Sequence, residues 1–263
     1  MTARWLFDLG NTRLKCAPLH GDGNIGETVA LAWRDGGIAT SLFDASIAGD
    51  VAYVSSVAAP VTTVALLDAL TQRFARISIA RTQKTFADMH IAYDDPVALG
   101  VDRFLALLGA RIRHPHAALV VGVGTALTID LLDAEGRHHG GRIAPSPALM
   151  RDALHQRAMQ LPPSGGAYVE FADDTLTALA SGCEGAALAL IERSVVAAEA
   201  VIGAVPALLL HGGGAGALLP HLPHAKSVPA LVLEGLAQWA ATELFFNRAD
   251  QLPCHPGERL EPS

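Results

Sequence analysis

The same local pattern occurs twice in this sequence and limits how the chain can fold. An apolar segment ends in a short turn that contains glycine and threonine, and an aspartate lies close by. The first copy is Asp8-Leu-Gly-Asn-Thr12, and the second, Gly124-Thr-Ala-Leu-Thr-Ile-Asp130, follows the apolar segment 117–123. In each half a strand, a turn and another strand precede helices, so the 263 residues are predicted to form two α/β halves that join near residue 115. Two facing turns of this kind can hold a polyphosphate from opposite sides.

The first turn has side chains suited to binding phosphate. Asp8 ends an apolar strand, where a carboxylate needs a partner or a function. Gly10 allows a tight turn with exposed N–H groups, and these amides, Thr12 and Lys15 can hold phosphate oxygens while Asp8 faces a magnesium ion. The alternative is a hairpin turn with an exposed acid.

A second cluster lies between Tyr93 and Arg103. Gly100 allows close backbone approach, and Asp102 and Arg103 stand at the start of a predicted helix. There an aspartate can accept a hydroxyl proton and an arginine can bind a carboxylate through two N–H groups. The alternative is an aspartate favoured by the helix dipole, with Arg103 as its surface partner.

The second turn continues into a strand that contains Asp130. A buried carboxylate needs a cation, which here is a metal ion, a monovalent ion or a neighbouring arginine. Thr125 and Thr128 either bond phosphate or fill strand positions. The late glycines of 212–214 nominally fit a dinucleotide fingerprint, but prolines follow at once, so a turn beside an adenine ring fits them better.

Composition excludes several classes of protein. The net charge of −7 argues against non-specific nucleic-acid binding. Cys16, Cys183 and Cys254 form no CxxC or metal-binding spacing, which predicts a reducing compartment. Charged residues or proline interrupt the apolar segments 117–132 and 195–210, so neither is predicted to span a membrane. We expect no signal peptide, because Arg4 and Asp8 interrupt the first apolar segment. We therefore expect a cytoplasmic protein with no membrane partner.

The histidines do not predict a metal site. The sequence holds 11 of them, including the pairs His114/His116 and His138/His139, without HExxH or a tetrahedral set. We expect them on the surface or in loops.

Periodicity and turn residues predict the elements of each half. The predicted strands are 25–33, 51–57, 77–79, 117–123, 128–132 and 207–210. The predicted helices are 103–112, 147–161, 174–201 and 229–246, together with one that opens at Pro60 and buries Val64, Leu67, Leu70 and Phe74 on one face. Gly182 and Gly185, one turn apart, predict a close helix approach.

Taken in order, these clusters resemble the type III pantothenate kinases. The matching motifs are Asp8-x-Gly-Asn-Thr-x-x-Lys15, Tyr93-x-x-Pro-x-x-Leu-Gly-x-Asp-Arg103, Gly124-Thr-Ala-x-Thr-x-Asp130, Gly140-Gly-x-Ile-x-Pro145, Thr175-x-x-Ala-x-x-Ser-Gly182 and Leu231-Val-Leu-Glu-Gly-Leu236. Any one of these motifs is weak evidence, whereas six in sequence are specific.

The resemblance implies a fold and an activity. The family belongs to the acetate kinase, sugar kinase, Hsp70 and actin superfamily. This implies two ribonuclease-H-like (actin-like ATPase) domains, 1–115 and 116–249, around an interdomain nucleotide cleft. The tail 250–263 contains three prolines and is predicted to be disordered. Members transfer the γ-phosphoryl of ATP to pantothenate, giving 4′-phosphopantothenate in the first step of coenzyme A biosynthesis. They need Mg²⁺ or another divalent cation and K⁺ or NH₄⁺, and they are typically homodimers with the site near the interface.

The resemblance also implies residue roles. Asp102 is the general base, and Arg103 holds the pantothenate carboxylate in a pocket that includes Tyr93, Gly100 and Thr175. The residues that face ATP are Asp8, Gly10, Asn11, Thr12, Lys15, Gly124, Thr125 and Thr128. Asp8 orients Mg²⁺ through water, and Asp130 binds the monovalent cation. Such chemistry is mainly alignment and charge neutralisation.

Two positions depart from the family pattern. The segment Gly-Gly-x-Ile-x-Pro-Gly ends here in Ser146, and the threonine that usually precedes the late Gly-Gly is His211. Both positions affect the shape of loops at the nucleotide-binding end of the site.

Two other functions stay open: a non-catalytic regulatory accessory factor on the same fold, and a kinase for another small hydroxy acid or sugar.

Overall fold

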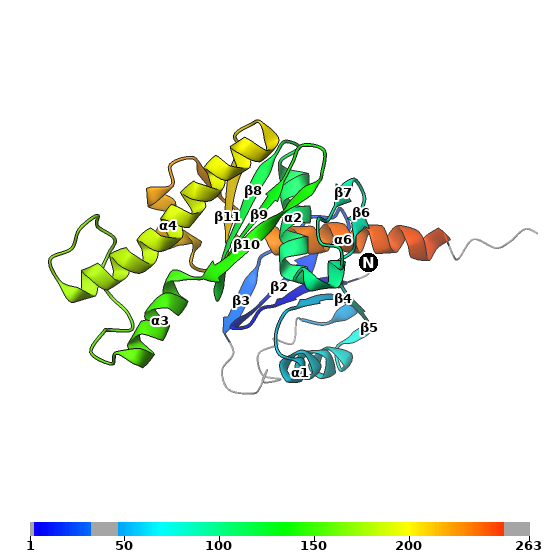
Figure 1. Ribbon diagram of the computed structural model, residues 1–263. Helices are drawn as coiled ribbons and strands as arrows, with labels where there is room; N and C mark the ends of the chain where they lie inside the picture. Colours follow the sequence, from blue (N-terminus) through cyan, green and yellow to red (C-terminus); the bar gives the residue numbers. More distant parts are fainter. Residues whose placement is uncertain (1–2, 33–46, 250–263) are drawn as a thin grey trace, which may run out of the picture.

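The computed structural model, which describes residues 3–32 and 47–249, contains two five-stranded sheets (Figure 1). The first sheet has the order β3-β2-β1-β4-β5. Its strands are β1 (Arg4–Leu9), β2 (Arg13–Leu19), β3 (Val29–Ala32), β4 (Gly49–Ser56) and β5 (Phe74–Ile79). The central strand β1 runs antiparallel to β2 and parallel to β4.

The second sheet repeats this topology. Its strands are β8 (Ala118–Val123), β9 (Ala126–Leu132), β10 (His138–Pro145), β11 (Ala207–His211) and β12 (Ala225–Ser227), in the order β10-β9-β8-β11-β12. Here β8 is central, antiparallel to β9 and parallel to β11. Each half of the chain thus builds a sheet of the same order and direction, as the doubled sequence pattern predicts.

Two helices lie between the sheets and share one core with both (Figure 1). They are α2 (Val101–Arg113) and α6 (Leu231–Ala249). This core joins Leu6 of β1 and Val120 of β8 to Phe104 of α2 and Leu236 of α6. The end of the chain therefore packs against the sheet built from its beginning, and α2 is held by both halves.

The other helices cover the outer faces. On the first sheet α1 (Pro60–Thr71) packs through Leu66 and Leu70, and on the second α4 (Thr175–Ile202) packs through Ala187 and Ile191. The helix α3 (Pro147–Arg157) packs against α4, and α3 and the N-terminal part of α4 project away from the sheets (Figure 1).

Several short elements complete the description. They are β6 (Thr85–Phe86), β7 (Met89–His90), α5 (Ala215–Leu218), and the 3₁₀ turns η2 (Pro96–Ala98) and η3 (Leu219–His221). Within residues 3–32 and 47–249, no helix has the length and apolar character needed to span a membrane.

The predicted strands are largely confirmed, with differences at their ends. The strand predicted over 25–33 is confined to Val29–Ala32, with residue 33 outside the described residues, and β2 was not predicted as a separate strand. Its residues alternate poorly because Cys16 and Ala17 are both buried, one on each face. The predicted tail also lies outside the described residues.

The predicted apolar face of α1 is confirmed only in part: Leu70 and Phe74 are buried and Leu67 packs against the same core, but Val64 does not. Thr62, Leu66, Ala69 and Leu70 are buried, whereas Val64 is 55% exposed. Almost every position of this helix is apolar or small, so periodicity defines no face and packing on the sheet decides it.

Two further predictions concern α3 and α4. The helix α3 ends at Arg157 rather than at 161. Ser146 precedes its first residue, Pro147, and its hydroxyl accepts a hydrogen bond from the Leu149 N–H. The residue that departs from the family pattern is thus an N-cap. The close helix approach predicted at Gly182 and Gly185 is wrong. A methyl group built at Gly182 meets nothing within 4 Å, and one built at Gly185 meets only the Tyr168 ring, which belongs to no helix.

Candidate active site

Three polar side chains form a row across the first sheet. Asp8 on β1 is paired with Lys15 on β2 and with Ser55 on β4. Directly paired residues point to the same face of a sheet, which here is the face of Leu6 that packs toward α2 and α6. The Ser55 hydroxyl donates a hydrogen bond of 2.9 Å to Asp8 Oδ1. Ser55 was not predicted as a site residue.

The environment of Asp8 disfavours its charge. Burial raises the pKa of Asp8 to about 6, and the nearby charge of Asp102 adds to this, whereas Ser55 and Lys15 act in the opposite direction. Its second oxygen, Oδ2, has no hydrogen-bond partner within the described residues. A partly buried carboxylate with one free oxygen fits a cation brought in with a ligand.

The turn that follows Asp8 leaves its polar groups open. Gly10 N–H donates to the Arg13 carbonyl at 2.9 Å and closes the turn, while Asn11 and Thr12 are exposed. Lys15 Nζ donates to the carbonyl of Pro229 at 3.3 Å, beside the start of α6. The residues predicted to face phosphates are thus grouped at one end of the sheet.

The first turn of α2 places Asp102 between the two sheets. Asp102 Oδ1 accepts a 2.9 Å hydrogen bond from the Arg103 N–H. A methyl group at Gly100 would lie 2.7 Å from that oxygen, so a side chain here would displace the Asp102 carboxylate. Burial raises the pKa of Asp102, and the charge of Asp130 acts in the same direction. The result is a carboxylate with enhanced proton affinity beside Asp8.

Arg103 and Asp130 form a buried ion pair. Arg103 Nε lies 2.8 Å from Asp130 Oδ2, and Nη2 lies 2.6 Å from Oδ1. Both side chains are less than a tenth exposed. Arg103 Nη1 also donates to the Tyr93 hydroxyl at 3.2 Å. Of the partners considered for Asp130, the structure therefore contains the neighbouring arginine.

His138 completes this cluster, and the prediction that it lies on the surface or in a loop is wrong. It is buried in β10, and its ring stacks on Tyr93 with centroids 6.0 Å apart. The Ala92 N–H donates to His138 Nδ1, so Nε2 carries the proton that it donates to Asp130 Oδ1 at 3.0 Å. A methyl group at Gly141 would lie 2.7 Å from Arg103 Nη2, so the Gly-Gly motif makes room for the ion pair.

The second phosphate turn joins β8 to β9. Gly124 N–H donates to the Ala126 carbonyl at 2.9 Å, and both Gly124 and Thr125 are exposed. Thr128 stands two residues before Asp130 on β9 and therefore shares its face. This turn thus offers its polar groups to the same space between the sheets.

Thr175 is not brought to the other predicted site residues. It is exposed in the first turn of α4, which Asp174 caps by accepting a 2.9 Å hydrogen bond from the Thr177 N–H. That end of α4 lies at the far side of the molecule from α2 (Figure 1). Within one chain, Thr175 is therefore separate from Asp102.

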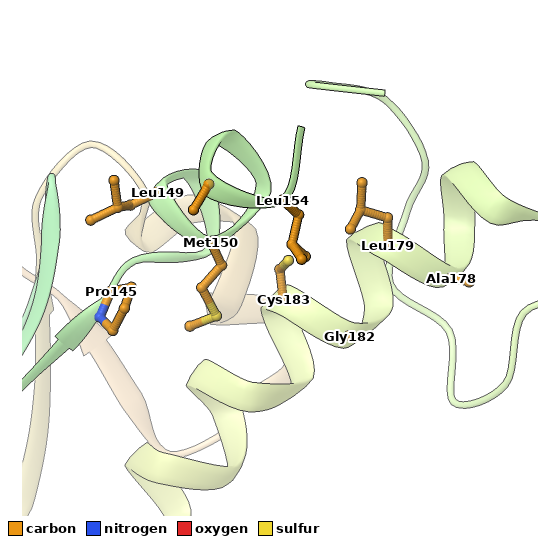
Figure 2. A pocket seen from close by; sticks show the side chains of 9 residues that line it. Pro145, Leu149, Met150, Leu154, Ala178, Leu179, Gly182 and Cys183 are labelled. Carbon is orange, nitrogen blue, oxygen red and sulfur yellow. The ribbon is translucent and has the colours of Figure 1, made fainter. Parts of the chain in front are cut away.

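An apolar cavity of about 640 Å³ lies between α3 and α4, near that end (Figure 2). Leu149, Met150 and Leu154 face Leu179 and Cys183 across it. It has almost no polar lining and contains none of the charged residues described above.

The described ranges contain no three His, Cys, Asp or Glu side chains grouped to hold a metal ion by themselves. A divalent cation beside Asp8 would take most of its ligands from water and phosphate, as Mg²⁺ commonly does.

Comparisons with known protein sequences agree on one family over most of the chain. A sequence model of the type III pantothenate kinase family matches residues 5–197. The type III pantothenate kinase of Stenotrophomonas maltophilia (strain R551-3) is 57% identical over 236 residues, which are 90% of this chain and 96% of that protein.

Three solved structures share the fold. A Campylobacter jejuni protein assigned by name to the Baf family of transcriptional activators has a TM-score of 0.59 at 20% identity, over 94% of this chain and 99% of its own. The activator of 2-hydroxyisocaproyl-CoA dehydratase from Clostridium difficile has a TM-score of 0.53 at 11% identity, over 97% of this chain and 100% of its own. A putative 2-dehydro-3-deoxygalactonokinase from Sinorhizobium meliloti has a TM-score of 0.56 at 14% identity, over 91% of this chain and 99% of its own, so the predicted two-sheeted fold is confirmed.

Proposed function

Because the chain belongs to the type III pantothenate kinase family, we propose that it phosphorylates pantothenate with ATP, in coenzyme A biosynthesis, between the ends of β1 and β8 and the first turn of α2. The observation that carries this location is the position of Asp102. Its carboxylate stands between two turns suited to phosphate, with Asp8 on one side and Arg103 on the other.

Asp102 serves as the general base. Its Oδ1 is held by the Arg103 N–H, and Oδ2 has no hydrogen-bond partner within the described residues. The raised pKa of Asp102 makes Oδ2 a better acceptor for the pantothenate hydroxyl proton. The developing alkoxide then attacks the γ-phosphorus in line with the leaving ADP.

Asp8 and Lys15 lie where the metal ion and the phosphates of ATP would bind. Mg²⁺, when bound with ATP, neutralises charge on the phosphates. The free Oδ2 of Asp8 fits a water ligand of that ion, and Lys15 Nζ reaches the same space. The amides and side chains of Gly10, Asn11 and Thr12 hold phosphate oxygens from the adjoining turn.

Arg103 binds the pantothenate carboxylate with the N–H groups that remain. Asp130 takes Nε and one Nη2 proton, and Tyr93 takes one Nη1 proton, which leaves one proton on each terminal nitrogen. The substrate would thus be held at the open end of the guanidinium, near Tyr93 and Gly100.

A monovalent cation at Asp130 does not fit the site in this arrangement. Both oxygens of Asp130 are bonded to Arg103, Oδ1 also accepts from His138, and the guanidinium charge would repel a second cation. A K⁺ or NH₄⁺ requirement stays a prediction of the family resemblance.

The separate position of Thr175 supports a homodimer in which each site draws on both protomers. The apolar cavity beside α3 and α4 lies near the same end, where Phe171 is 98% exposed and Met159 80%. A mixed dimer of Asp102→Asn and Thr175→Arg protomers tests this. If Asp102 of one protomer acts with Thr175 of the other, each mixed dimer keeps one intact site and activity is restored. If the two residues act within one chain, both sites are damaged and no activity is restored.

The first test of the function is ADP release with ATP, Mg²⁺ and pantothenate. We expect pantothenate-dependent turnover, and we expect Asp102→Asn to lower it about 100-fold or more with folding and ATP binding retained. Turnover only with another hydroxy acid would favour a different kinase. ATP binding without turnover on any acceptor would favour a regulatory factor. The cytoplasmic location stays a prediction.

A further inference from the structure

The second sheet carries a row of residues that corresponds to Lys15–Asp8–Ser55. On β8, Gly122 takes the place of Asp8, because it too stands two residues before the glycine of the turn. It is paired with Thr128 on β9 and with His211 on β11. Residues paired in this way point to one face, so Thr128 and His211 flank a position that has no side chain.

The missing side chain of Gly122 leaves a small cradle. A methyl group built there would lie 2.6 Å from Thr128 Oγ1 and 3.0 Å from His211 Nε2. The hydroxyl and the imidazole edge thus reach the same point from opposite sides. Neither forms a side-chain hydrogen bond with any residue in the described part of the chain. Two unpaired polar groups around a space of this size fit a ligand oxygen.

The cradle lies between the two phosphate turns. A methyl group at Gly213, just after β11, would lie 2.9 Å from the Arg13 guanidinium of the first turn. The charges of Lys15 and Asp130 both act on His211. The end of β11 therefore lies against the first turn, and His211 stands between the halves.

We propose that His211 is a phosphate-binding residue of the nucleotide site, which donates from Nε2 to a β- or γ-phosphate oxygen while Thr128 donates to the same phosphate. This rests on the proposed binding of ATP between the two turns. Burial lowers the pKa of His211 to about 4, and Lys15 acts in the same direction, so the imidazole is neutral near pH 7. One ring nitrogen then carries a proton and can donate.

Binding of ATP, ADP and adenosine to the whole protein, measured by calorimetry, tests this without requiring turnover. We expect His211→Ala to weaken ATP binding about tenfold, the cost of a hydrogen bond to a charged group, and to leave adenosine binding unchanged. ADP binding should weaken equally if the contact is to the β-phosphate and stay unchanged if it is to the γ-phosphate. His211→Gln, which keeps a neutral N–H donor, should bind ATP within about threefold of the wild type. His224→Ala is the control, because His224 is exposed outside the site.

Two results would overturn the proposal. Equal losses for adenosine and ATP would place His211 at the adenine, and unchanged ATP binding would remove it from the ligand altogether. If the alanine variant does not fold, His211→Gln compared with His211→Leu gives the same contrast at similar volume. Failure of the proposed function has another signature, namely wild-type protein that binds ATP without phosphorylating pantothenate.

Discussion

The crossing of α2 and α6 gives a sharp prediction, because a single methyl group should both destabilise the protein and displace its proposed base. A methyl group at Gly235 would lie 2.6 Å from the carbonyl carbon of Leu105 and 3.0 Å from its Cα, where ordinary contacts are 3.4–4 Å. These are main-chain atoms of the other helix, so no side-chain rotation can relieve the overlap. The Gly235→Ala variant must separate the helices by about 1 Å at the crossing.

The cost can be worked out from two opposing contributions. Overpacking a core costs about 1–3 kcal/mol, and the upper value applies where the obstacle is backbone. Alanine is about 1 kcal/mol better than glycine inside a helix. We expect a net loss of about 2 kcal/mol in the free energy of unfolding. Because Asp102 lies in the first turn of α2, we also expect turnover to fall by tenfold or more, since a misplacement of about 1 Å can cost about 100-fold.

Urea denaturation and steady-state turnover measure the two effects. Gly216→Ala in α5 is the matched control, because a methyl group there meets nothing within 4 Å. We expect the control to be as stable as the wild type or up to about 1 kcal/mol more stable. A Gly235→Ala protein with wild-type stability and turnover would refute the reasoning, because α2 and α6 would then not be in direct backbone contact.

Three more predictions concern charge and assembly. The raised pKa of Asp8 means that its ionised form, which dominates above about pH 6, destabilises the folded protein. Without ligands, Asp8→Asn should therefore be more stable than the wild type at pH 8, and this difference should vanish as the pH falls from 6 to 4. A difference that does not change with pH would contradict the burial of Asp8. Asp130→Asn leaves Arg103 buried without its counter-charge, so we expect urea denaturation to show a free energy of unfolding lower by about 3 kcal/mol. We also expect a raised KM for pantothenate. Wild-type stability would contradict a buried ion pair. Phe171→Asp should shift sedimentation from dimer to monomer, whereas an unchanged dimer would place the interface away from this end of α4.

The residues that the sequence predicted share a local signal. Asp8 and Thr128 stand beside glycine-containing turns, and Asp102 and Arg103 stand at a helix start, so a few neighbouring residues identify them. The structure groups these residues between the sheets because the strand order carries both turns to the same end.

The residues that the sequence did not predict depend on register between distant segments. Ser55 reaches Asp8 because β4 pairs with β1 across 47 residues. His138 reaches Asp130 because β10 shifts register between His138 and Gly141, which turns the histidine into the core. No local pattern in the sequence reports such pairings, and the sequence alone left Asp130 with three kinds of partner for the same reason.

The two rows have different chemistry at corresponding positions, which suggests why the duplication is useful. The first row holds Lys15 and the carboxylate of Asp8, and the second holds Thr128 and a neutral His211 around Gly122. A second carboxylate at Gly122 would repel both Asp8 and the phosphates, and it would fill the cradle. ATP brings its own negative charge and its own metal ion, so one charged row is enough to bind them. The other row can then supply uncharged hydrogen-bond donors that orient the phosphates. A Gly122→Ala variant should therefore lose ATP affinity without any change in charge, because its methyl group occupies the place of a phosphate oxygen.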